Sequence, residues 1–375
     1  MRGRAARRPH RRHPHLPSRQ SDIRQTPTAT CFARTWPLAQ IPSDYLPPQA
    51  DVNTVPIHRI GPLVPESGNF TNVAVILVKR DATGTPYFKY FGNGAQGKRA
   101  ETWSSSKVFA VMNGAGRLGA KCGPSSAGLW QSTQGKYGAT PLGDLATIIV
   151  TYSTAFPPYS SNGLGGWFEM LGTRERARHP VKSWLMRPNE TYGANYGAAP
   201  PSDLAFTFQP GNCSVVPDSA ANGGNANHLS ALTMAEMVKR AVLARELPQK
   251  QQWPGTIWED AQNLLYGANR STFFPGLTWG GMSANADDQL RLGLDMAEIE
   301  RRSSGKWRTF SKDGCGNADY LINGYACYSD ASNPANGVEY VVSARVSAST
   351  LMPAGRSIRQ GMTAINKAIY NQILK

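Results

Sequence analysis

Several features are missing from this sequence, and each absence removes a class of function. No apolar run is long enough to cross a membrane or to form the core of a secretion signal. The Gly-x-Ser-x-Gly, His-Glu-x-x-His and Cys-x-x-Cys patterns are also absent, which argues against an elbow-type serine hydrolase, a zinc protease and a dithiol oxidoreductase. Acidic residues are scarce, with 25 Asp and Glu against 40 Lys and Arg.

The excess positive charge is concentrated at the N-terminus. The first 40 residues contain nine arginines and one acid, with few large apolar side chains to bury. Such a segment favours disorder, so residues 1–50 are predicted to be a basic extension and linker. An arginine-rich tail can bind nucleic acid, but the rest of the chain carries an ordinary basic charge, so nucleic acid is not the favoured partner. The Arg7-Arg8 pair is not followed by an apolar run, so the sequence itself gives no export signal.

Five cysteines leave at least one thiol unpaired. Cys315 and Cys327 flank a turn region and would face each other across a hairpin. Two interpretations stay open for this pair: a disulfide, which would suit an oxidising compartment, or two free thiols.

Patterns near the two ends of the chain predict strands of one sheet, with a helix at the C-terminal end. Asn72–Val78 is a continuous apolar run typical of a buried strand, and the turn at residues 81–84 predicts a hairpin with Tyr87–Phe91. Val338–Val346 alternates in a way that predicts a half-buried antiparallel strand. Isoleucines and a methionine at helical spacing predict a C-terminal helix with one apolar face from Ile358 to Ile373.

Apolar residues at helical spacing predict helices in the middle of the chain. Leu145, Ile148, Ile149 and Tyr152 fall on one face of a predicted helix, and a second runs over 163–171 with Gly172 as its C-cap. Ser230–Arg245 is a third. The prediction is therefore an α/β (α+β) fold, an antiparallel sheet with a mostly helical insertion. Residues 51–103 and 303–375 would form the sheet subdomain, and 104–302 the helical one, with a long loop at 173–229.

Three short motifs follow one another along the chain, at residues 104–107, 160–162 and 312–314. Ser104-Ser-Ser-Lys107 opens an apolar helix, and the three-residue spacing places Lys107 over the Ser104 hydroxyl. Ser160-Ser-Asn162 precedes the next helix. Lys312-Asp-Gly314 leads towards a predicted strand. Each motif has an ordinary alternative, since serine is a common N-cap and a second Ser-x-x-Lys occurs at Ser303 in a polar stretch.

As a set, the motifs resemble the active site of the penicillin-binding protein and serine β-lactamase superfamily. The resemblance covers roughly residues 70–350 and implies that fold, with N- and C-terminal helices flanking the sheet. It implies a serine acyl-enzyme on Ser104 with Lys107 as base, no metal or cofactor, and export to the periplasm or the exterior. By the same resemblance Ser160 relays a proton and Asn162 orients the substrate. Lys312 supplies positive charge, Gly314 lets backbone approach the substrate, and the Cys315 N–H completes an oxyanion hole with that of Ser104.

The sequence departs from the superfamily at two places. Asp313 stands where the family usually has a hydroxyl that binds a substrate carboxylate, and a carboxylate there would repel that group. A glutamate that activates water for deacylation is not evident, and Glu190 is a weak candidate.

We therefore expect a serine acyl hydrolase or transferase acting on a small-molecule or peptide ester or amide, and not a proficient β-lactamase. The alternative is a non-catalytic binding protein that keeps the fold.

Overall fold

The computed structural model describes residues 35–48, 52–64, 69–124, 131–132, 138–152, 159–172, 189–209, 212–219, 226–266, 281–285, 287–332 and 337–373. The predicted basic extension up to residue 34 falls outside these residues. Within the described ranges, every helix is too short or too polar to cross a membrane.

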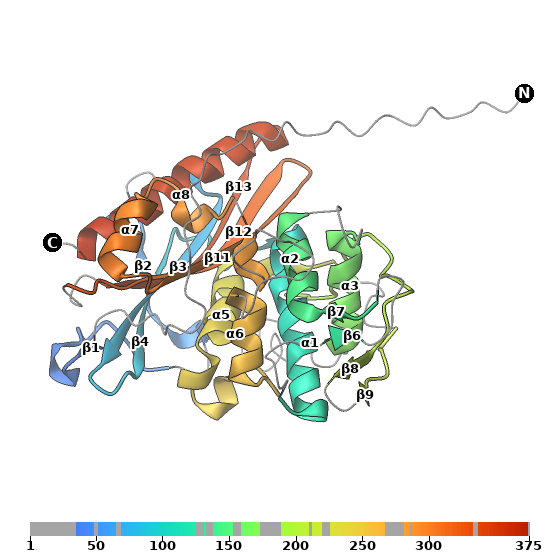
Figure 1. Ribbon diagram of the computed structural model, residues 1–375. Coiled ribbons are helices and arrows are strands. Elements are labelled where there is room, and N and C mark those ends of the chain that lie inside the picture. The colour runs from blue at the N-terminus through green and yellow to red at the C-terminus, as the bar shows by residue number, and fades with distance from the viewer. Residues whose placement is uncertain are drawn as a thin grey trace, which may run out of the picture.

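A central sheet joins strands from both ends of the chain, as predicted (Figure 1). In the described part of the chain it has seven strands, in the order β11-β12-β13-β3-β4-β2, with β1 paired to β3. The pairings from β11 to β4 are antiparallel, whereas the short β1 and β2 run parallel to β3 and β4. The strands are β1 (Thr35–Trp36), β2 (Ile57–Arg59), β3 (Asn72–Asp81), β4 (Pro86–Gly92), β11 (Trp307–Gly316), β12 (Asp319–Tyr328) and β13 (Val338–Ser347).

The β3–β4 hairpin follows from its turn residues. The Asp81 carboxylate accepts hydrogen bonds from the backbone N–H groups of Thr83 and Thr85, each at 2.9 Å. Gly84 has a φ of 87°, which glycine adopts without strain. The predicted hairpin is confirmed, with both strands longer than the apolar runs suggested.

The prediction that β13 is half-buried was wrong. It lies between β12 and β3 in the sheet, and nearly all its residues are buried. Its two faces are covered because α5 and α8 both pack on this strand. The buried Glu339 carboxylate is compensated by Arg80, with the Arg80 Nη2 and Glu339 Oε1 atoms 2.8 Å apart. An alternating pattern predicts a solvent-exposed face only when no other element packs on that face.

Helices cover both faces of the sheet (Figure 1). On one face lie α7 (Met296–Ser303) and α8 (Leu351–Ile373), the predicted C-terminal helix. The predicted stripe is confirmed, since Ile358, Met362, Ile365 and Ile369 are buried against that face of the sheet.

The other face packs on the helical region. Its α-helices are α1 (Lys107–Cys122), α2 (Leu142–Thr151), α3 (Ser161–Gly172), α5 (Ala231–Val242) and α6 (Trp258–Tyr266). Gly172 is the last helical residue of α3, and a Cβ there would lie 2.9 Å from the Asn113 carbonyl carbon. Gly172, which was predicted as a C-cap, thus lies within the helix and allows α3 to pack closely on α1. Short 3-10 helices connect the elements: η1 (Leu38–Gln40), η2 (Val52–Thr54), η4 (Trp103–Ser106), η6 (Ala244–Glu246), η7 (Gln249–Gln251), η8 (Gly281–Ala284) and η9 (Gln289–Arg291).

Small sheets complete the helical region. One pairs β5 (Arg99–Glu101) with β10 (His228–Ser230). The other has the order β7-β6-β8-β9, made of β6 (Gln131–Ser132), β7 (Thr140–Pro141), β8 (Thr207–Gln209) and β9 (Cys213–Ser214). Part of the predicted loop at 173–229 thus forms strands, while residues 173–188 lie outside the described ranges.

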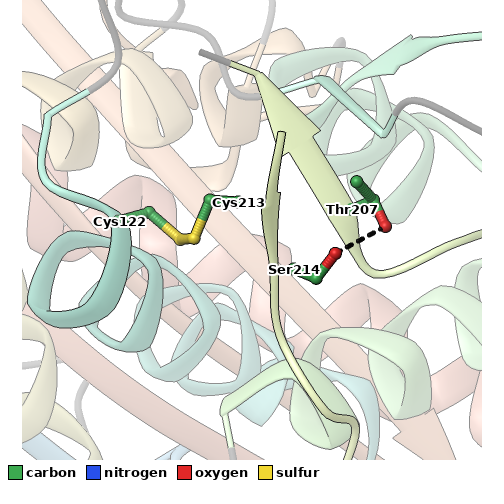
Figure 2. The surroundings of a disulfide bond; sticks show 4 residues. All are labelled: Cys122, Thr207, Cys213 and Ser214. Carbon is green, nitrogen blue, oxygen red and sulfur yellow. Dashed lines mark hydrogen bonds between the residues drawn. A yellow bond between two sulfur atoms is a disulfide. The ribbon is translucent and has the colours of Figure 1, made fainter. Parts of the chain in front are cut away.

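A disulfide joins Cys122, at the end of α1, to Cys213 in β9 (Figure 2). Beside it, the Thr207 and Ser214 hydroxyls of β8 and β9 lie 3.1 Å apart. Neither of the two interpretations left open for Cys315 and Cys327 holds. Cys315 is an exposed free thiol near the turn between β11 and β12, so the pair forms no disulfide. Cys327 is opposite Arg308 at the far end of the hairpin and is itself disulfide-bonded, so the two are not both free thiols either.

Candidate active site

The segment from Thr102 to Lys107 enters α1 through the 3-10 helix η4. The backbone of Thr102 is fixed because its N–H donates to the Asn227 carbonyl at 2.7 Å. Trp103 follows with a φ of 47°, a conformation that is strained for a bulky side chain. Ser104 comes next and is partly exposed. A strained residue immediately before a candidate nucleophile is typical of a site where the fold dictates the position of the following side chain.

Lys107 is the first residue of α1, one turn after Ser104, and its side chain is fully buried. Its Nζ donates to the Ser161 Oγ at 2.9 Å and to the Asn162 Oδ1 at 2.5 Å. The Ser161 hydroxyl itself donates to the Ile149 carbonyl at 2.8 Å, so it accepts from the lysine. A neutral amine has two N–H groups, and these two hydrogen bonds use both of them. The lone pair on the nitrogen is then available to a third neighbour.

The environment of Lys107 favours that neutral form. Burial, followed by the positive charge of Lys312, holds the pKa of Lys107 well below its usual value, and the charge of Asp313 offsets part of this effect. The rings of Tyr152 and Tyr196 lie 5.7 and 5.4 Å from its Nζ. A buried lysine of this kind is suited to act as a general base.

Of the predicted Ser160-Ser-Asn162 motif, the structure brings Ser161 and Asn162, but not Ser160, into hydrogen-bonding contact with Lys107. Ser160 is exposed, and its Oγ accepts the Gly163 N–H at 2.9 Å at the start of α3. This is the N-cap interaction that the sequence also allowed. The predicted role of Ser160 as a proton relay stays a prediction.

Lys312 lies in β11, an edge strand of the described sheet, and is fully buried. Its Nζ donates to the Tyr152 hydroxyl at 2.5 Å and to the Asp313 carbonyl at 2.8 Å. The Asp313 Oδ1 is 3.5 Å away. Burial alone would lower the pKa of Lys312, but the Asp313 charge and the Tyr152 hydroxyl raise it above its usual value. Lys312 is therefore the charged member of the two lysines.

Asp313 is oriented by a second tyrosine. The Tyr320 hydroxyl donates to the Asp313 Oδ2 at 3.0 Å. Although burial opposes ionisation, the charge of Lys312 and the Tyr320 hydrogen bond lower the pKa of Asp313. Alternation along β11 places Asp313 on the opposite face of the strand from Lys312, and the two side chains meet at the strand edge.

Gly314 allows β11 to approach η4 closely. A Cβ on Gly314 would lie 2.8 Å from the Ser104 backbone nitrogen and 2.5 Å from that of Ser105. The predicted role of Gly314, to let backbone approach the substrate, stays a prediction. Cys315 follows at the exposed edge. That its N–H would join that of Ser104 in an oxyanion hole stays a prediction.

Glu190 has a different role from the one the sequence suggested. It is buried, and its Oε1 accepts the Ser230 N–H at 2.9 Å and the Thr233 hydroxyl at 2.7 Å. These bonds fix the start of α5, so the contacts of Glu190 are those of a helix-capping residue.

A second buried carboxyl group, that of Glu169, is connected to Lys107 through two tyrosines. Tyr196, which contacts Lys107, shares a 3.1 Å hydrogen bond with Tyr192, whose hydroxyl is 3.4 Å from the Glu169 Oε2. Burial raises the pKa of Glu169 to about 8.

Tyr152 is the main site residue that sequence reasoning missed. It was predicted on the apolar face of α2, yet it is the left-handed C-cap of that helix and is 47% exposed. A left-handed turn at one residue redirects its side chain towards the lysines, and helical periodicity contains no signal for that. Among the described residues, no group of His, Cys, Asp and Glu could hold a metal ion.

No protein-family model matches the sequence, and no curated protein matches it. Among solved structures, this chain is similar to β-lactamases from Xanthomonas campestris and Burkholderia vietnamiensis. Each is 12% identical with a TM-score of 0.43, over 82% of this chain and 94% and 95% of theirs. A class A β-lactamase from Mycobacterium abscessus is 12% identical with a TM-score of 0.41, over 82% of this chain and 97% of that one. These are likenesses of fold, so the function proposed below rests on the positions of this chain's own side chains.

Proposed function

We propose that the protein is a serine acyl hydrolase or transferase that forms an ester between Ser104 and an acyl group taken from an ester or amide substrate. Lys107 is the general base, and no metal or organic cofactor takes part. The substrate is a small molecule or peptide.

The observation that carries this proposal is the hydrogen bonding of Lys107. Both acceptors of its amine, the Ser161 Oγ and the Asn162 Oδ1, are supplied by α3. Burial and Lys312 favour the neutral amine. A buried neutral lysine one helical turn from a partly exposed serine is the pairing that activates a serine nucleophile.

Lys107 takes the Ser104 proton as the Ser104 Oγ forms a bond to the substrate carbonyl carbon. The oxyanion that develops is stabilised by backbone N–H groups at η4 and β11. The bond to the leaving group then breaks as that group receives the proton, which returns Lys107 to its neutral form. Water or another nucleophile releases the acyl group from Ser104.

Intact-mass measurement with an alkyl fluorophosphonate tests the proposal. We expect one adduct on the wild type and none on Ser104→Ala. Ser303→Ala removes the serine of the second Ser-x-x-Lys and is the matched control, which should label like the wild type. Labelling of Ser104→Ala at the wild-type rate would show that the nucleophile lies elsewhere.

A non-catalytic binding protein is the second candidate. It is favoured by the contacts of Glu190, which are committed to the start of α5 and leave that residue without a place in deacylation. Turnover of 4-nitrophenyl butyrate by the wild type but not by Ser104→Ala would reject it. Equal, buffer-level rates for both proteins would support it.

We also propose that the protein acts outside the cytoplasm. The Cys122–Cys213 disulfide supports this, because such bonds persist mainly in oxidising compartments. Cell fractionation with thiol alkylation tests it: the native protein should be found outside the cytoplasm, with these two cysteines protected from the reagent.

A further inference from the structure

The ammonium group of the buried Lys312 is already in contact with protein groups, so it has little capacity to bind a substrate. An ammonium group has three N–H donors. Here its neighbours are the Tyr152 hydroxyl at 2.5 Å, the Asp313 carbonyl at 2.8 Å and the Asp313 carboxylate at 3.5 Å. The side chain has no exposed surface. A substrate carboxylate would therefore have to displace one of these protein contacts to reach it.

The charges near the nucleophile also cancel. Lys312 and Asp313 form a pair of opposite charge, and the Tyr320 hydroxyl orients the Asp313 carboxylate at 3.0 Å. Lys107, the other nearby lysine, serves as a neutral base. Gly314, which follows Asp313 in β11, packs against the backbone nitrogen of Ser104. A substrate anion at Ser104 would therefore lie near this pair, be repelled by its carboxylate and find no unpaired positive charge among these groups. Like charges brought together in a partly desolvated site oppose binding.

We infer that Asp313 selects substrates by charge, so that the site prefers ester or amide acyl donors with no carboxylate near the scissile bond. This rests on the proposed function and specifies its substrate class. The residue at this one position decides the preference, because an uncharged side chain here would leave Lys312 as an unpaired cation next to Ser104.

Two matched esters test the inference on the full-length protein. The phenylacetyl esters of 3-hydroxybenzamide and 3-hydroxybenzoic acid have nearly the same shape, and only the second is an anion. We expect wild-type kcat/KM to favour the neutral ester by on the order of tenfold or more. In Asp313→Asn, that ratio should fall by on the order of tenfold, because Lys312 loses its paired anion.

Controls separate this inference from the proposed function. Asp313→Ser is a second uncharged variant in case the amide disturbs folding, and Glu298→Gln removes an exposed acid in α7 and should leave the ratio unchanged. A wild type that prefers the anionic ester, or an unchanged ratio in both Asp313 variants, would overturn the inference alone. Undiminished turnover of both esters by Ser104→Ala would overturn the proposed function instead.

Binding gives a readout that does not depend on turnover. 3-Carbamoylphenylboronic acid and 3-carboxyphenylboronic acid add to an activated serine and differ only in charge. Calorimetry should show tighter binding of the neutral compound to the wild type, with the difference reduced in Asp313→Asn. Tighter binding of the anion would contradict the inference. If neither compound binds and neither ester is cleaved, both the inference and the acyl-enzyme proposal fail.

Discussion

The Nζ of Lys107 lies 2.5 Å from the Oδ1 of Asn162, which joins the first turn of α1 to the first turn of α3. These two residues are 55 positions apart in the chain. Because α1 and α3 pack closely, the contact is made inside the fold, where the amide oxygen receives an N–H and leaves the lysine lone pair for another partner.

Replacing Lys107 with Met should abolish acylation while leaving Ser104 in place. Without the base, the rate of covalent labelling should fall by on the order of a hundredfold to ten-thousandfold. The measurement is the rate of fluorophosphonate labelling by intact mass. Lys306→Met alters the second Ser-x-x-Lys and should label normally; equal losses in both variants would point to a general effect on folding.

The pH dependence of acylation should report the depressed pKa of Lys107. The amine is active only when neutral, so the rate should rise as pH passes upward through this lowered pKa and then level off. Removing the Asp313 charge should move this rise to lower pH, since that charge raises the Lys107 pKa. Removing the Lys312 charge should move it to higher pH. The profile of kcat/KM for 4-nitrophenyl butyrate in Asp313→Asn and Lys312→Met checks both directions. Shifts of the same sign would contradict the assignment.

Tyr152→Phe should weaken activity by removing the hydroxyl that contacts Lys312 while keeping the ring beside both lysines. A hydrogen bond to a charged group contributes about 1.5–3 kcal/mol, so we expect kcat/KM to fall by about tenfold to a hundredfold. Ser160→Ala is the comparison, because Ser160 contacts Gly163 and not Lys107. A larger loss in Ser160→Ala than in Tyr152→Phe would favour the role that the superfamily resemblance gives to Ser160.

Gly314→Ala should damage the site through packing. Its new Cβ would contact the backbone nitrogens of Ser104 and Ser105, so η4 or β11 must move. We expect a loss of about 1–3 kcal/mol in the free energy of unfolding, together with reduced labelling of Ser104. Gly355→Ala in α8 is the matched control. Its Cβ would meet Tyr320 at an ordinary 3.6 Å, and the variant should gain about 0.5–1 kcal/mol. Denaturant titration of both variants measures this, and a Gly314→Ala protein of wild-type stability would argue against the close approach.

Glu169 should make stability depend on pH. Its pKa is raised to about 8 in the folded protein, so the folded state keeps a proton that the unfolded chain releases at lower pH. The free energy of unfolding should therefore decrease as pH rises from the unfolded pKa to about 8. Glu169→Gln stays neutral and should flatten this decrease, whereas Glu298→Gln should not. Urea titrations at pH about 5 and about 9 compare the three proteins. An unchanged slope in Glu169→Gln would show that another group carries the effect.

Local patterns determined much of this fold. The β3–β4 hairpin, the apolar stripe of α8 and the helix predicted over Ser230–Arg245, observed as α5, are confirmed, because each depends on side-chain periodicity or turn residues that neighbours in sequence supply. Motif order also indicated Lys107 and Asn162, and the structure brings these two side chains together.

Tertiary structure alone decided the rest. Tyr152 contacts Lys312, 160 positions away in the sequence, because the chain adopts a left-handed conformation at the end of α2. The spacing of apolar residues cannot predict the φ angle of a single residue. Both faces of β13 are buried because α5 and α8 pack on it, and Arg80 of another strand compensates the buried Glu339. The Cys122–Cys213 bond needs the end of α1 beside β9, 91 residues away. Long-range contacts such as these arise from packing, in which distant segments satisfy each other's polar groups, and so the spacing of residues along the chain does not reveal them.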